Sequence, residues 1–538
     1  MQVTTIDILL FFILALAFTH PAFAGNRPNR HLVAGAGFFG GVIGPGAVLV
    51  LHRAIFHRGT VVLYRRRRLP GYDRFVREAV EVRFRIAVLA LALLALAFAP
   101  ARAAAPGSSQ TWLVVSDIHL DPFDSDEYPA RVGSDTNLAL FDQVIDQMKH
   151  SVPDPAVILI PGDFLAHGFP GKAHTGAPAS SVAQTGLRTM QRIASAFAKA
   201  FPHARFAIAL GNNDASCGDY HTDIGEAYLL EVARIWKPLI DRDGAAPNFV
   251  HSFLAGGYYA VDLPMPGLRV VVVNTVPMSS QYRGNCDGAA PNAARNELAW
   301  LHAELAAPPE GMHNVVMMHI PPGYDPVSTQ YAHGFLAWSF LQGGYNATLL
   351  STLENPKSRV RLVITGHLHH FDFRVARGIP MLVFGSISPV YRNNPAFYAL
   401  HVDGDGTVND VDTYAYDEWS GDWLDGPRSF DTAWGVPRVD AQSLIALHVR
   451  LGNDESLRAQ WALGSVGWPS NPSFKWASWT GRWRIPWCSQ TILRGDYAKC
   501  ADIRARVDAF RATVAAIAVA IVVAIILLIG ALERRRVR

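Results

Sequence analysis

Short apolar runs recur along residues 111–417 and alternate with stretches in which apolar positions repeat with helical spacing. Five runs of four or five residues have the character of buried strands and cover residues 112–115, 157–160, 206–210, 315–318 and 360–364. Helices are predicted at residues 138–149, where Ser134 or Asp135 is placed to act as the cap, and at residues 296–305. This alternation predicts a layered α/β domain, to which we assign residues 104–417.

The C-terminal end carries a longer apolar stretch. Residues 512–532 are 21 consecutive uncharged positions. As a helix this stretch would be about 31 Å long, which matches a bilayer core of about 30 Å. Four arginines follow within residues 533–538. The positive-inside rule therefore predicts a transmembrane helix at residues 512–532, a cytoplasmic tail at residues 533–538 and a catalytic domain on the outer, periplasmic side.

The N-terminal end resembles an export signal that begins late. Residues 82–103 combine a basic start, a 13-residue apolar stretch and a small-residue cleavage site, as signal peptides do. Residues 1–81 precede this segment and leave two interpretations open. Translation starts near residues 76–82, which we favour, or residues 1–81 form a membrane hairpin. On either interpretation the domain after Ala104 is exported.

Side chains that bind metal ions follow the five apolar runs closely. Parallel strands open at their carboxyl ends into loops that share one crevice, so these side chains are expected to converge. Carboxylate oxygen, amide oxygen and neutral imidazole suit divalent cations, and seven residues with one shared carboxylate are enough for two ions. The predicted ligands are Asp117, His119, Asp163, Asn212, His319, His367 and His369. The sequence thus predicts a two-metal hydrolase that needs no serine or cysteine nucleophile.

The order of these motifs resembles that of the calcineurin-like metallophosphoesterases, over most of residues 111–417. A closer resemblance is to the acid sphingomyelinase-like phosphodiesterases, a group that includes endopolyphosphatases. Four stretches carry it: SDIHLDPF from Ser116, GDFLAH from Gly162, VVNTVP from Val272 and SISPVYRNNPAF from Ser386. The resemblance implies a four-layer α/β/β/α sandwich of two mixed sheets flanked by helices.

The resemblance also implies a role for each ligand. Three residues match the ligands of the first metal, three match those of the second, and one matches the bridge between them. The first set is Asp117, His119 and His369, the second is Asn212, His319 and His367, and the bridge is Asp163. The ions expected by this resemblance are zinc, manganese or iron.

Two further residues are candidates for catalysis. His167 lies just beyond Asp163, where the family uses a histidine on the substrate phosphate. Asn213 occupies a position where the wider family has a histidine, and an amide donates a hydrogen bond but supplies no proton at neutral pH. His167 is therefore the expected replacement as proton donor, ahead of His221 and His370. Both His167 and Asn213 are expected to contact the phosphoryl group or the leaving oxygen.

These features predict a membrane-anchored, metal-dependent phosphoesterase, similar to a sphingomyelinase, that acts on a phosphate ester and preferably a phosphodiester. Rival hypotheses are an endopolyphosphatase, a nucleotide phosphodiesterase, and a catalytically silent surface binding protein on the same fold. No six-cysteine module precedes Thr111, which weakens the sphingomyelin hypothesis specifically. The net charge of +3 gives no sign of a nucleic-acid partner. The oligomeric state stays open.

Cysteines and tryptophans add expectations about the rest of the chain. Four cysteines in an exported domain favour two disulfides, and joining neighbours in sequence gives Cys217–Cys286 and Cys488–Cys500, with free thiols as the alternative. Nine of the thirteen tryptophans lie in residues 418–511, which we treat as a Trp-rich C-terminal subdomain. Two arrangements are expected for its tryptophans: a packed aromatic face against the catalytic domain, or a belt at a membrane surface. The turn-rich residues 321–344, beside His319, are expected to wall the substrate cleft.

Overall fold

The computed structural model describes residues 55–57, 60–62, 109–173, 179–288, 290–306, 308–471 and 482–536. The chain divides into two units, Met1–Ala101 and Arg102–Arg538. In the first unit, β1 (Ile55–His57) and β2 (Thr60–Val62) form an antiparallel pair. The signal-like residues 82–103 and most of the extension at 1–81 lie outside the described residues. The predictions made for them stay predictions.

The second unit contains a sheet with the strand order β18-β17-β16-β3-β4-β5, and β19 pairs with β17. Its core strands β3, β4 and β5 run parallel, while β16 pairs antiparallel with both β3 and β17. The strands are β3 (Gln110–Val114), β4 (Val157–Ile160), β5 (Arg205–Ile208), β16 (Ala396–Val402), β17 (Val408–Asp417), β18 (Asp422–Trp423) and β19 (Arg428–Ser429).

A second large sheet has the order β14-β15-β13-β10-β8-β7. Its four inner strands run parallel, and β14 and β7 close its edges antiparallel. The strands are β7 (Tyr259–Asp262), β8 (Leu268–Val273), β10 (His313–Met318), β13 (Val360–Thr365), β14 (Asp372–Ala376) and β15 (Ile379–Val383). The predicted α/β class is therefore confirmed, with two mixed sheets, and all five predicted strands are present.

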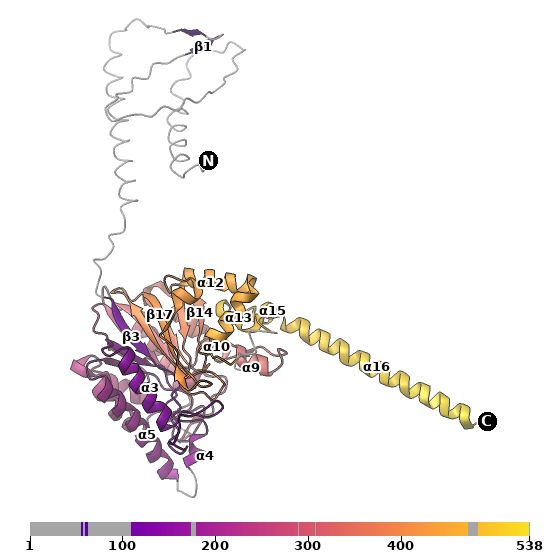
Figure 1. The fold of residues 1–538 in the computed structure, drawn as a ribbon, viewed down its shortest axis with the longest axis horizontal. Helices are drawn as coiled ribbons and strands as arrows, with labels where there is room; N and C mark the ends of the chain where they lie inside the picture. Colours follow the sequence, from indigo (N-terminus) through magenta and orange to yellow (C-terminus); the bar gives the residue numbers. More distant parts are fainter. Residues whose placement is uncertain are drawn as a thin grey trace. The chain divides into compact units, whose positions relative to one another are not determined.

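Alternation along the strands determines what each face of a sheet packs against. In β8, Val270 and Val272 join the core that contains the first sheet, whereas Val271 and Val273 join a second core. That second core holds α8 (Ala293–Ala306) and α10 (Gly343–Leu353). The first sheet packs with α3 (Leu138–Ser151), α5 (Ala179–Ala200) and α6 (Ala227–Ile240), of which α3 and α5 lie side by side (Figure 1). The inner strands β4, β8 and β15 are buried on both faces, as near-continuous apolar strands require.

The first predicted helix is present, but its cap differs from the expectation. The Asn137 side chain accepts a hydrogen bond from the Leu140 amide at 3.0 Å and begins α3. Ser134 and Asp135 therefore do not cap it, and the Asp135 carboxylate contacts His167 instead. The second predicted helix begins at Ala293, three residues earlier than expected.

Helices of the C-terminal region pack onto the catalytic core. They are α11 (Phe430–Trp434), α12 (Ala441–Asn453), α13 (Glu455–Gly464), α14 (Arg484–Thr491) and α15 (Tyr497–Cys500). Trp434 and Trp461 are buried in the same core as the strands, and Trp487 stacks on His448 with ring centroids 4.3 Å apart. These tryptophans thus form packed aromatic contacts. Trp476 and Trp479 lie in residues 472–481, outside the described part of the chain.

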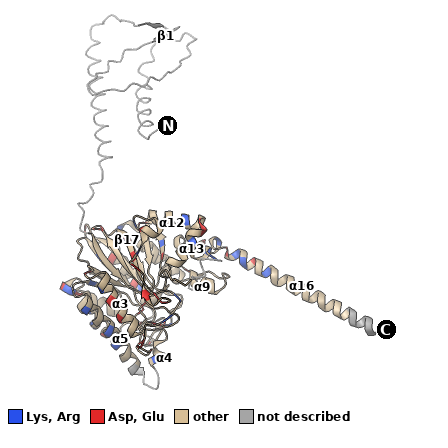
Figure 2. Cartoon of the chain, viewed as in Figure 1, with Lys and Arg blue, Asp and Glu red and all other residues tan. Residues whose placement is uncertain are grey.

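Both predicted disulfides are present, Cys217–Cys286 and Cys488–Cys500. The C-terminal helix α16 spans Ile503–Arg536, and its residues Ile503–Ile529 are long and apolar enough to span a membrane. Its side chains are exposed from residue 508 to residue 529. Figure 2 shows charged residues on the first turns of α16 and none along its described apolar part. Within the described residues, no other helix meets this criterion of length and apolarity.

Candidate metal centre

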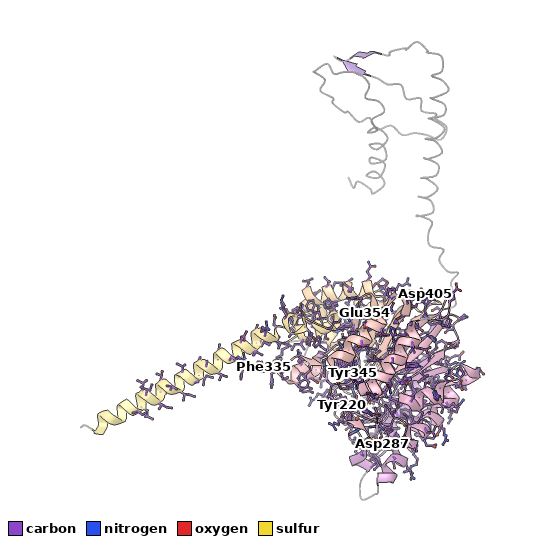
Figure 3. All side chains as sticks on the ribbon, turned by 180° about the vertical axis from the view of Figure 1, so that it is seen from behind. Tyr220, Asp287, Phe335, Tyr345, Glu354 and Asp405 are labelled. Carbon is purple, nitrogen blue, oxygen red and sulfur yellow. A yellow bond between two sulfur atoms is a disulfide. The ribbon has the colours of Figure 1, made fainter. Side chains whose placement is uncertain are left out.

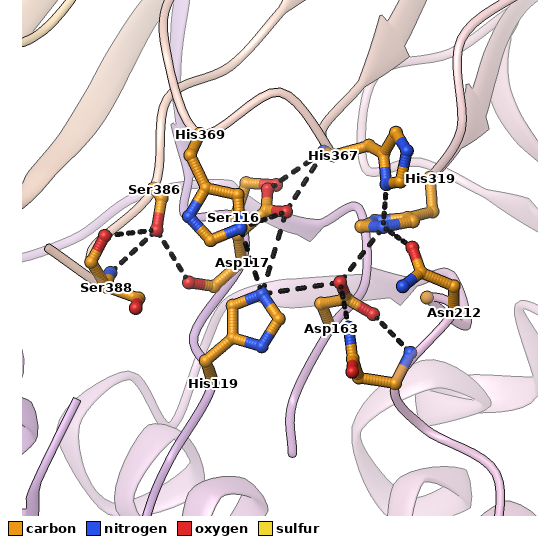
Figure 4. A network of polar contacts seen from close by, with 12 residues as sticks. Ser116, Asp117, His119, Asp163, Asn212, His319, His367, His369, Ser386 and Ser388 are labelled. Atoms are coloured by element: carbon orange, nitrogen blue, oxygen red, sulfur yellow. Dashed lines mark hydrogen bonds and ion pairs between the residues drawn. The ribbon is translucent and has the colours of Figure 1, made fainter. Parts of the chain in front are cut away.

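All seven predicted ligands come from loops that follow the carboxyl ends of β3, β4, β5, β10 and β13. Each ligand lies no more than five residues beyond its strand. Within each sheet these strands run parallel to one another, so their carboxyl ends lie at the same edge of that sheet. Figure 4 shows the side chains of these residues converging there. All of them are buried except His367, which is partly exposed.

One group of donors surrounds the Nε2 atom of His119. His369 Nε2 lies 3.1 Å from it, Asp163 Oδ2 lies 3.3 Å away and Asp117 Oδ1 lies 4.0 Å away. The Asp117 Oδ1 atom is also 3.5 Å from His369 Nε2. Four nitrogen and oxygen atoms therefore enclose one small space.

A second group of donors surrounds the Nε2 atom of His319. Asn212 Oδ1 lies 3.1 Å from it, while Asp163 Oδ2 and His367 Nδ1 both lie 3.2 Å away. The same oxygen of Asp163 thus belongs to both groups. Two four-donor groups joined by one carboxylate oxygen are typical of binuclear metal sites.

Hydrogen bonds on the far sides of the rings show that cations fit these groups. The Nδ1 atoms of His119 and His319 donate to the carbonyl oxygens of Leu165 and Pro161, each at 3.0 Å. Each Nε2 atom can then carry at most one proton, which satisfies one neighbour only. Two or three acceptor atoms nevertheless lie within 3.3 Å of each Nε2. A divalent cation satisfies all of them at once.

The electrostatics of the centre favour added positive charge. Burial lowers the pKa of His119 and of His319, but the Asp163 carboxylate outweighs burial and raises each to about 9. Burial opposes ionisation of Asp163 itself, yet the two histidines hold its pKa well below its usual value. Burial lowers the pKa of His367 to about 3, so this ring stays a neutral donor. The carboxylates therefore attract cations to the His119 and His319 nitrogens.

The backbone at the ligands is held in a sparsely populated conformation. Five of the seven ligands have positive φ angles between 43° and 75°, and these are Asp117, His119, Asp163, His367 and His369. Such left-handed conformations cost about 1–3 kcal/mol each for residues with a side chain. Gly162 shows how tightly the loops pack, because a Cβ there would lie 2.7 Å from the Gly211 nitrogen. The strained backbone thus orients these side chains toward the metal centre.

Comparison with known proteins identifies the family of this centre. Residues 111–371 match the calcineurin-like phosphoesterase family. The chain is a calcineurin-like metallophosphoesterase. It is also 28% identical over 303 residues to sphingomyelinase phosphodiesterase D of Dictyostelium discoideum, an alignment that covers 53% of this chain and 62% of that protein. The chain thus spans less than two thirds of the length of this relative.

Comparison with solved structures finds similarity to two proteins named as 5′-nucleotidases and to one named as an anchor. A putative 5′-nucleotidase from Staphylococcus aureus is 17% identical, with coverage of 60% of this chain and 54% of that chain and a TM-score of 0.29. A 5′-nucleotidase precursor from Thermus thermophilus is 13% identical, with coverage of 64% and 59% and a TM-score of 0.28. GAP50, the anchor in the inner membrane complex of Plasmodium, is 12% identical, with coverage of 63% and 95% and a TM-score of 0.31.

In this metallophosphoesterase, His167 lies against the first donor group. Its ring stacks on His119 with centroids 3.9 Å apart. Its Nδ1 atom donates to Asp135 Oδ1 at 2.7 Å, and its Nε2 atom lies 3.4 Å from the Tyr391 hydroxyl. Burial raises the pKa of Asp135, but the hydrogen bond from His167 and nearby positive charge outweigh it and lower the pKa to about 2. Asp135 is therefore an ionised partner that orients His167, with Lys172 as a second contact at 2.7 Å.

The side chain of Asn213 contacts the carboxylate that the two donor groups share. Its side-chain amide donates to Asp163 Oδ2 at 3.0 Å, and its backbone amide donates to Asp163 Oδ1 at 2.8 Å. The residue lines the pocket, and one of its two side-chain amide hydrogens is directed at the shared carboxylate. The phosphoesterase thus uses Asn213 to fix Asp163, a contact that the motif pattern did not indicate.

Sequence reasoning missed three residues that position the ligands. Asp214 accepts backbone hydrogen bonds from Asp163, Phe164, Leu165 and Gly211 at 2.7 to 3.3 Å and so holds two ligand loops together. Asp219 accepts from the Asn212 amide at 2.7 Å, which turns Asn212 Oδ1 toward His319. Asp135 was interpreted as a helix cap. Asp214 could have been noticed as the last residue of the Gly-Asn-Asn-Asp motif, whereas the other two contacts depend on tertiary structure.

The metal centre forms the floor of a pocket of about 550 Å³. Residues 321–344 contribute Asp325, Val327, Ser328, Gln330, Tyr331 and Phe340 to its lining, which confirms that this segment walls the cleft. Of the two weaker candidates for proton donor, His370 lines this pocket, and burial lowers its pKa to about 3. The Nδ1 atom of His221 donates to the Gly284 carbonyl oxygen at 3.2 Å, and His221 is not part of the lining.

Proposed function

We propose that this metallophosphoesterase is a phosphodiesterase that works with two divalent cations, zinc, manganese or iron. The observation that carries the proposal is the pair of four-donor groups that share Asp163 Oδ2. Asp117, His119 and His369 would hold the first cation, Asn212, His319 and His367 would hold the second, and Asp163 would contribute to both sites. Two cations so held lower the pKa of water and offset the charge of a phosphoryl group.

The protein supplies orientation and protons. Asn213 and Asp214 fix the shared carboxylate and its loop before substrate arrives, so no reorganisation is needed during the reaction. His167 presents its Nε2 atom toward the pocket while Asp135 holds its Nδ1 proton. We assign to His167 the transfer of a proton to the leaving oxygen, a role that Asn213 does not fill.

The pocket lining supports a phosphodiester with an uncharged or cationic substituent. Among its lining side chains are the carboxylates of Asp219 and Asp325, with Arg392 as the one arginine and no lysine in the described part. A polyphosphate chain carries many negative charges, and apart from the two proposed cations this lining offers a single arginine to pair with them. Tyr220, Tyr331, Phe340 and Tyr391 add aromatic surface that accepts apolar or cationic groups. The similarity to a sphingomyelinase phosphodiesterase points the same way.

The proposed location is the outer face of a membrane. An exposed apolar helix, α16, can serve as the anchor, and its basic end favours a cytoplasmic C-terminus. Two disulfides suit an oxidising compartment such as the periplasm.

The test is a hydrolysis panel with the full chain and added Zn²⁺, Mn²⁺ or Fe²⁺. The substrates are bis-p-nitrophenyl phosphate, p-nitrophenyl phosphate, sphingomyelin, ATP and polyphosphate. We expect metal-dependent cleavage of the diesters, faster than that of ATP or polyphosphate. Preference for polyphosphate would favour the endopolyphosphatase hypothesis. Tight metal binding without cleavage of any substrate would favour a silent binding protein.

A further inference from the structure

Three exposed apolar side chains occur close together in the sequence of the segment that walls the catalytic pocket. Tyr331, Leu336 and Trp338 are 75%, 57% and 43% exposed, and they occur within eight residues of one another. We call these three residues the apolar rim. Large apolar side chains gathered in so short a segment are typical of a contact surface, and tyrosine and tryptophan are enriched where a membrane meets water.

The segment that carries the apolar rim is fixed to the catalytic core. β11 (Tyr324–Asp325) pairs with β12 (Trp338–Ser339), and α9 (Pro326–Tyr331) lies between them. The buried Arg374 guanidinium donates to the carbonyl oxygens of Pro322 and Tyr324 at 3.1 and 3.0 Å. These contacts hold the apolar rim in one place relative to the metal centre.

The same segment is attached to the base of α16. The Phe335 ring lies 5.1 Å from the Phe510 ring of α16, and Figure 3 shows Phe335 close to the start of that helix. Gln330 and Arg482 exchange two hydrogen bonds, at 3.4 and 3.2 Å. The Tyr324 ring stacks on Tyr497 with centroids 4.2 Å apart, just ahead of α16. The membrane-spanning candidate and the apolar rim are therefore parts of one packed assembly.

The contact with Phe510 sets the level of the apolar rim relative to a bilayer. Phe510 lies two residues ahead of Ala512, where the uncharged stretch begins, so it is about 3 Å from that point along the helix axis. The head-group region on each side of a bilayer is about 5–7 Å thick. If α16 spans the membrane, Phe335 and the neighbouring apolar rim lie at the depth of the head groups.

Charged side chains at the base of α16 suit the same level. Arg504, Arg506 and Arg511 occupy its first turns together with Asp508. The carboxylate of Asp502, directly ahead of the helix, is paired with Arg484 at 2.6 Å. The excess of arginine favours a layer rich in phosphate groups.

The catalytic pocket opens next to the apolar rim. Tyr331 belongs both to the rim and to the pocket lining. Tyr391 also lines the pocket, is 53% exposed, and lies 4.6 Å from the His369 ring. The path from the apolar rim to the metal centre is therefore only a few side chains long.

We propose that the apolar rim inserts into the head-group layer of the bilayer that holds α16 and keeps the pocket mouth against that surface. The occupant is a phospholipid or sphingolipid surface, whose phosphodiester enters the pocket without leaving the membrane. The inference rests on the proposed function, which it deepens by assigning the substrate to the bilayer rather than to the surrounding water.

Substitutions in the apolar rim test this with activity. The full chain is reconstituted in phosphatidylcholine vesicles containing sphingomyelin, and hydrolysis of this lipid is compared with that of bis-p-nitrophenyl phosphate in water. Leu336→Asp with Trp338→Asp should lower lipid hydrolysis about tenfold, as expected when burial of a large apolar side chain is lost. Hydrolysis of the soluble diester should stay unchanged, because neither residue lines the pocket.

The matched control is Ile445→Asp with Trp419→Asp, which changes exposed apolar residues elsewhere in the domain. It should leave both activities unchanged. Equal losses in the rim and control variants, or wild type that cleaves the soluble diester but no vesicle lipid, would overturn the inference and leave the proposed function intact. Wild type that cleaves neither substrate would instead remove the proposed function.

A spin label gives a second measurement that does not depend on activity. All four native cysteines are paired, so Leu336→Cys introduces the one free thiol of the chain. In vesicles, a label there should be shielded from a water-soluble nickel complex and open to oxygen, whereas a label at Ile445→Cys should show the reverse. Equal accessibility at both sites would contradict the inference, as would shielding at residue 336 that rises with the protein-to-lipid ratio, which would indicate contact between copies of the chain.

Discussion

On the floor of the catalytic pocket the metal-binding side chains leave the ends of strands and are almost all buried, whereas on its rim three apolar side chains are exposed. Asp163 on the floor is held by Asn213 and by a backbone loop that Asp214 fixes. Tyr331 on the rim ends α9, which is fastened through Gln330 to Arg482, just ahead of α14. The side chains of the floor thus suit cation binding and catalysis. The rim, in our proposal, determines that catalysis takes place at the membrane surface. Changes on the floor should act on every substrate, and changes on the rim on lipid substrates only.

The largest effect is expected at the carboxylate that the two donor groups share. Asp163→Asn removes the negative charge that both cations need, so activity should fall at least ~10⁴-fold on all substrates. Steady-state hydrolysis of bis-p-nitrophenyl phosphate measures this. Asp372→Asn is the matched control, because Asp372 is equally buried and bonds to Gln490 away from the floor. A similar loss in the control would mean that folding, not cation binding, had failed.

A smaller and selective loss is expected for the proposed proton donor. His167→Ala should lower the rate ~10²–10⁴-fold when the leaving group is an alcohol, and less when it is p-nitrophenol, which leaves without a proton. Asp135→Asn should show the same pattern more weakly, since His167 remains but loses its ionised partner. A leaving-group series on wild type and both variants decides this. Identical losses across the series would show that His167 binds the phosphoryl group and donates no proton to the leaving oxygen.

Acidity should weaken cation binding on the floor. Asp163 raises the pKa of His119 and of His319 to about 9 against the effect of burial. Below that pH both rings therefore carry a second proton, on Nε2, in addition to the one on Nδ1. A cation must displace these protons, and its affinity should fall by up to about tenfold per proton for each pH unit between 9 and 6.5. Calorimetric titration of the metal-free chain with Mn²⁺ measures the affinity and the protons released. An affinity that stays constant over this range would contradict the assignment of these nitrogens.

The smallest effect is expected one contact away from the ligands. Asp219→Leu removes the acceptor that orients the Asn212 amide, at 2.7 Å in the native chain. Loss of such a contact typically weakens metal affinity by about 10–100-fold, and the lower end is expected because Asn212 itself remains. The Mn²⁺ concentration needed for half-maximal activity should rise, while the rate at saturating Mn²⁺ should hold. A fall in the saturated rate without a change in Mn²⁺ requirement would speak against this role.

The same contrast explains what the sequence could predict. Each ligand on the floor follows a strand whose apolar run is visible in the sequence, and strand ends converge by topology, so His319 and Asp117 could be placed together without coordinates. The partners of these ligands come from distant segments with no local signal. Asp135 looked like a helix cap because it precedes α3, and only tertiary packing shows that Asn137 fills that role. Asn213 could be recognised as unusual, but the direction of its amide could not.

The apolar rim shows the same limit. Residues 321–344 were expected to wall the cleft because they follow His319, and they do so. Their attachment to α16 depends on a contact between Phe335 and Phe510, two residues that lie far apart in the sequence. The hydrophobic and motif pattern of the sequence therefore predicts the residues of the site. It does not predict the tertiary contacts that place the apolar rim beside α16.

The central claim is that one carboxylate oxygen, Asp163 Oδ2, belongs to two cation sites. Elemental analysis of the purified, active full chain, combined with Asp163→Asn, tests it most directly. The account predicts two divalent ions per wild-type chain and loss of both from the variant in parallel with activity. One ion or none in fully active wild type, or a variant that keeps two ions, would contradict it.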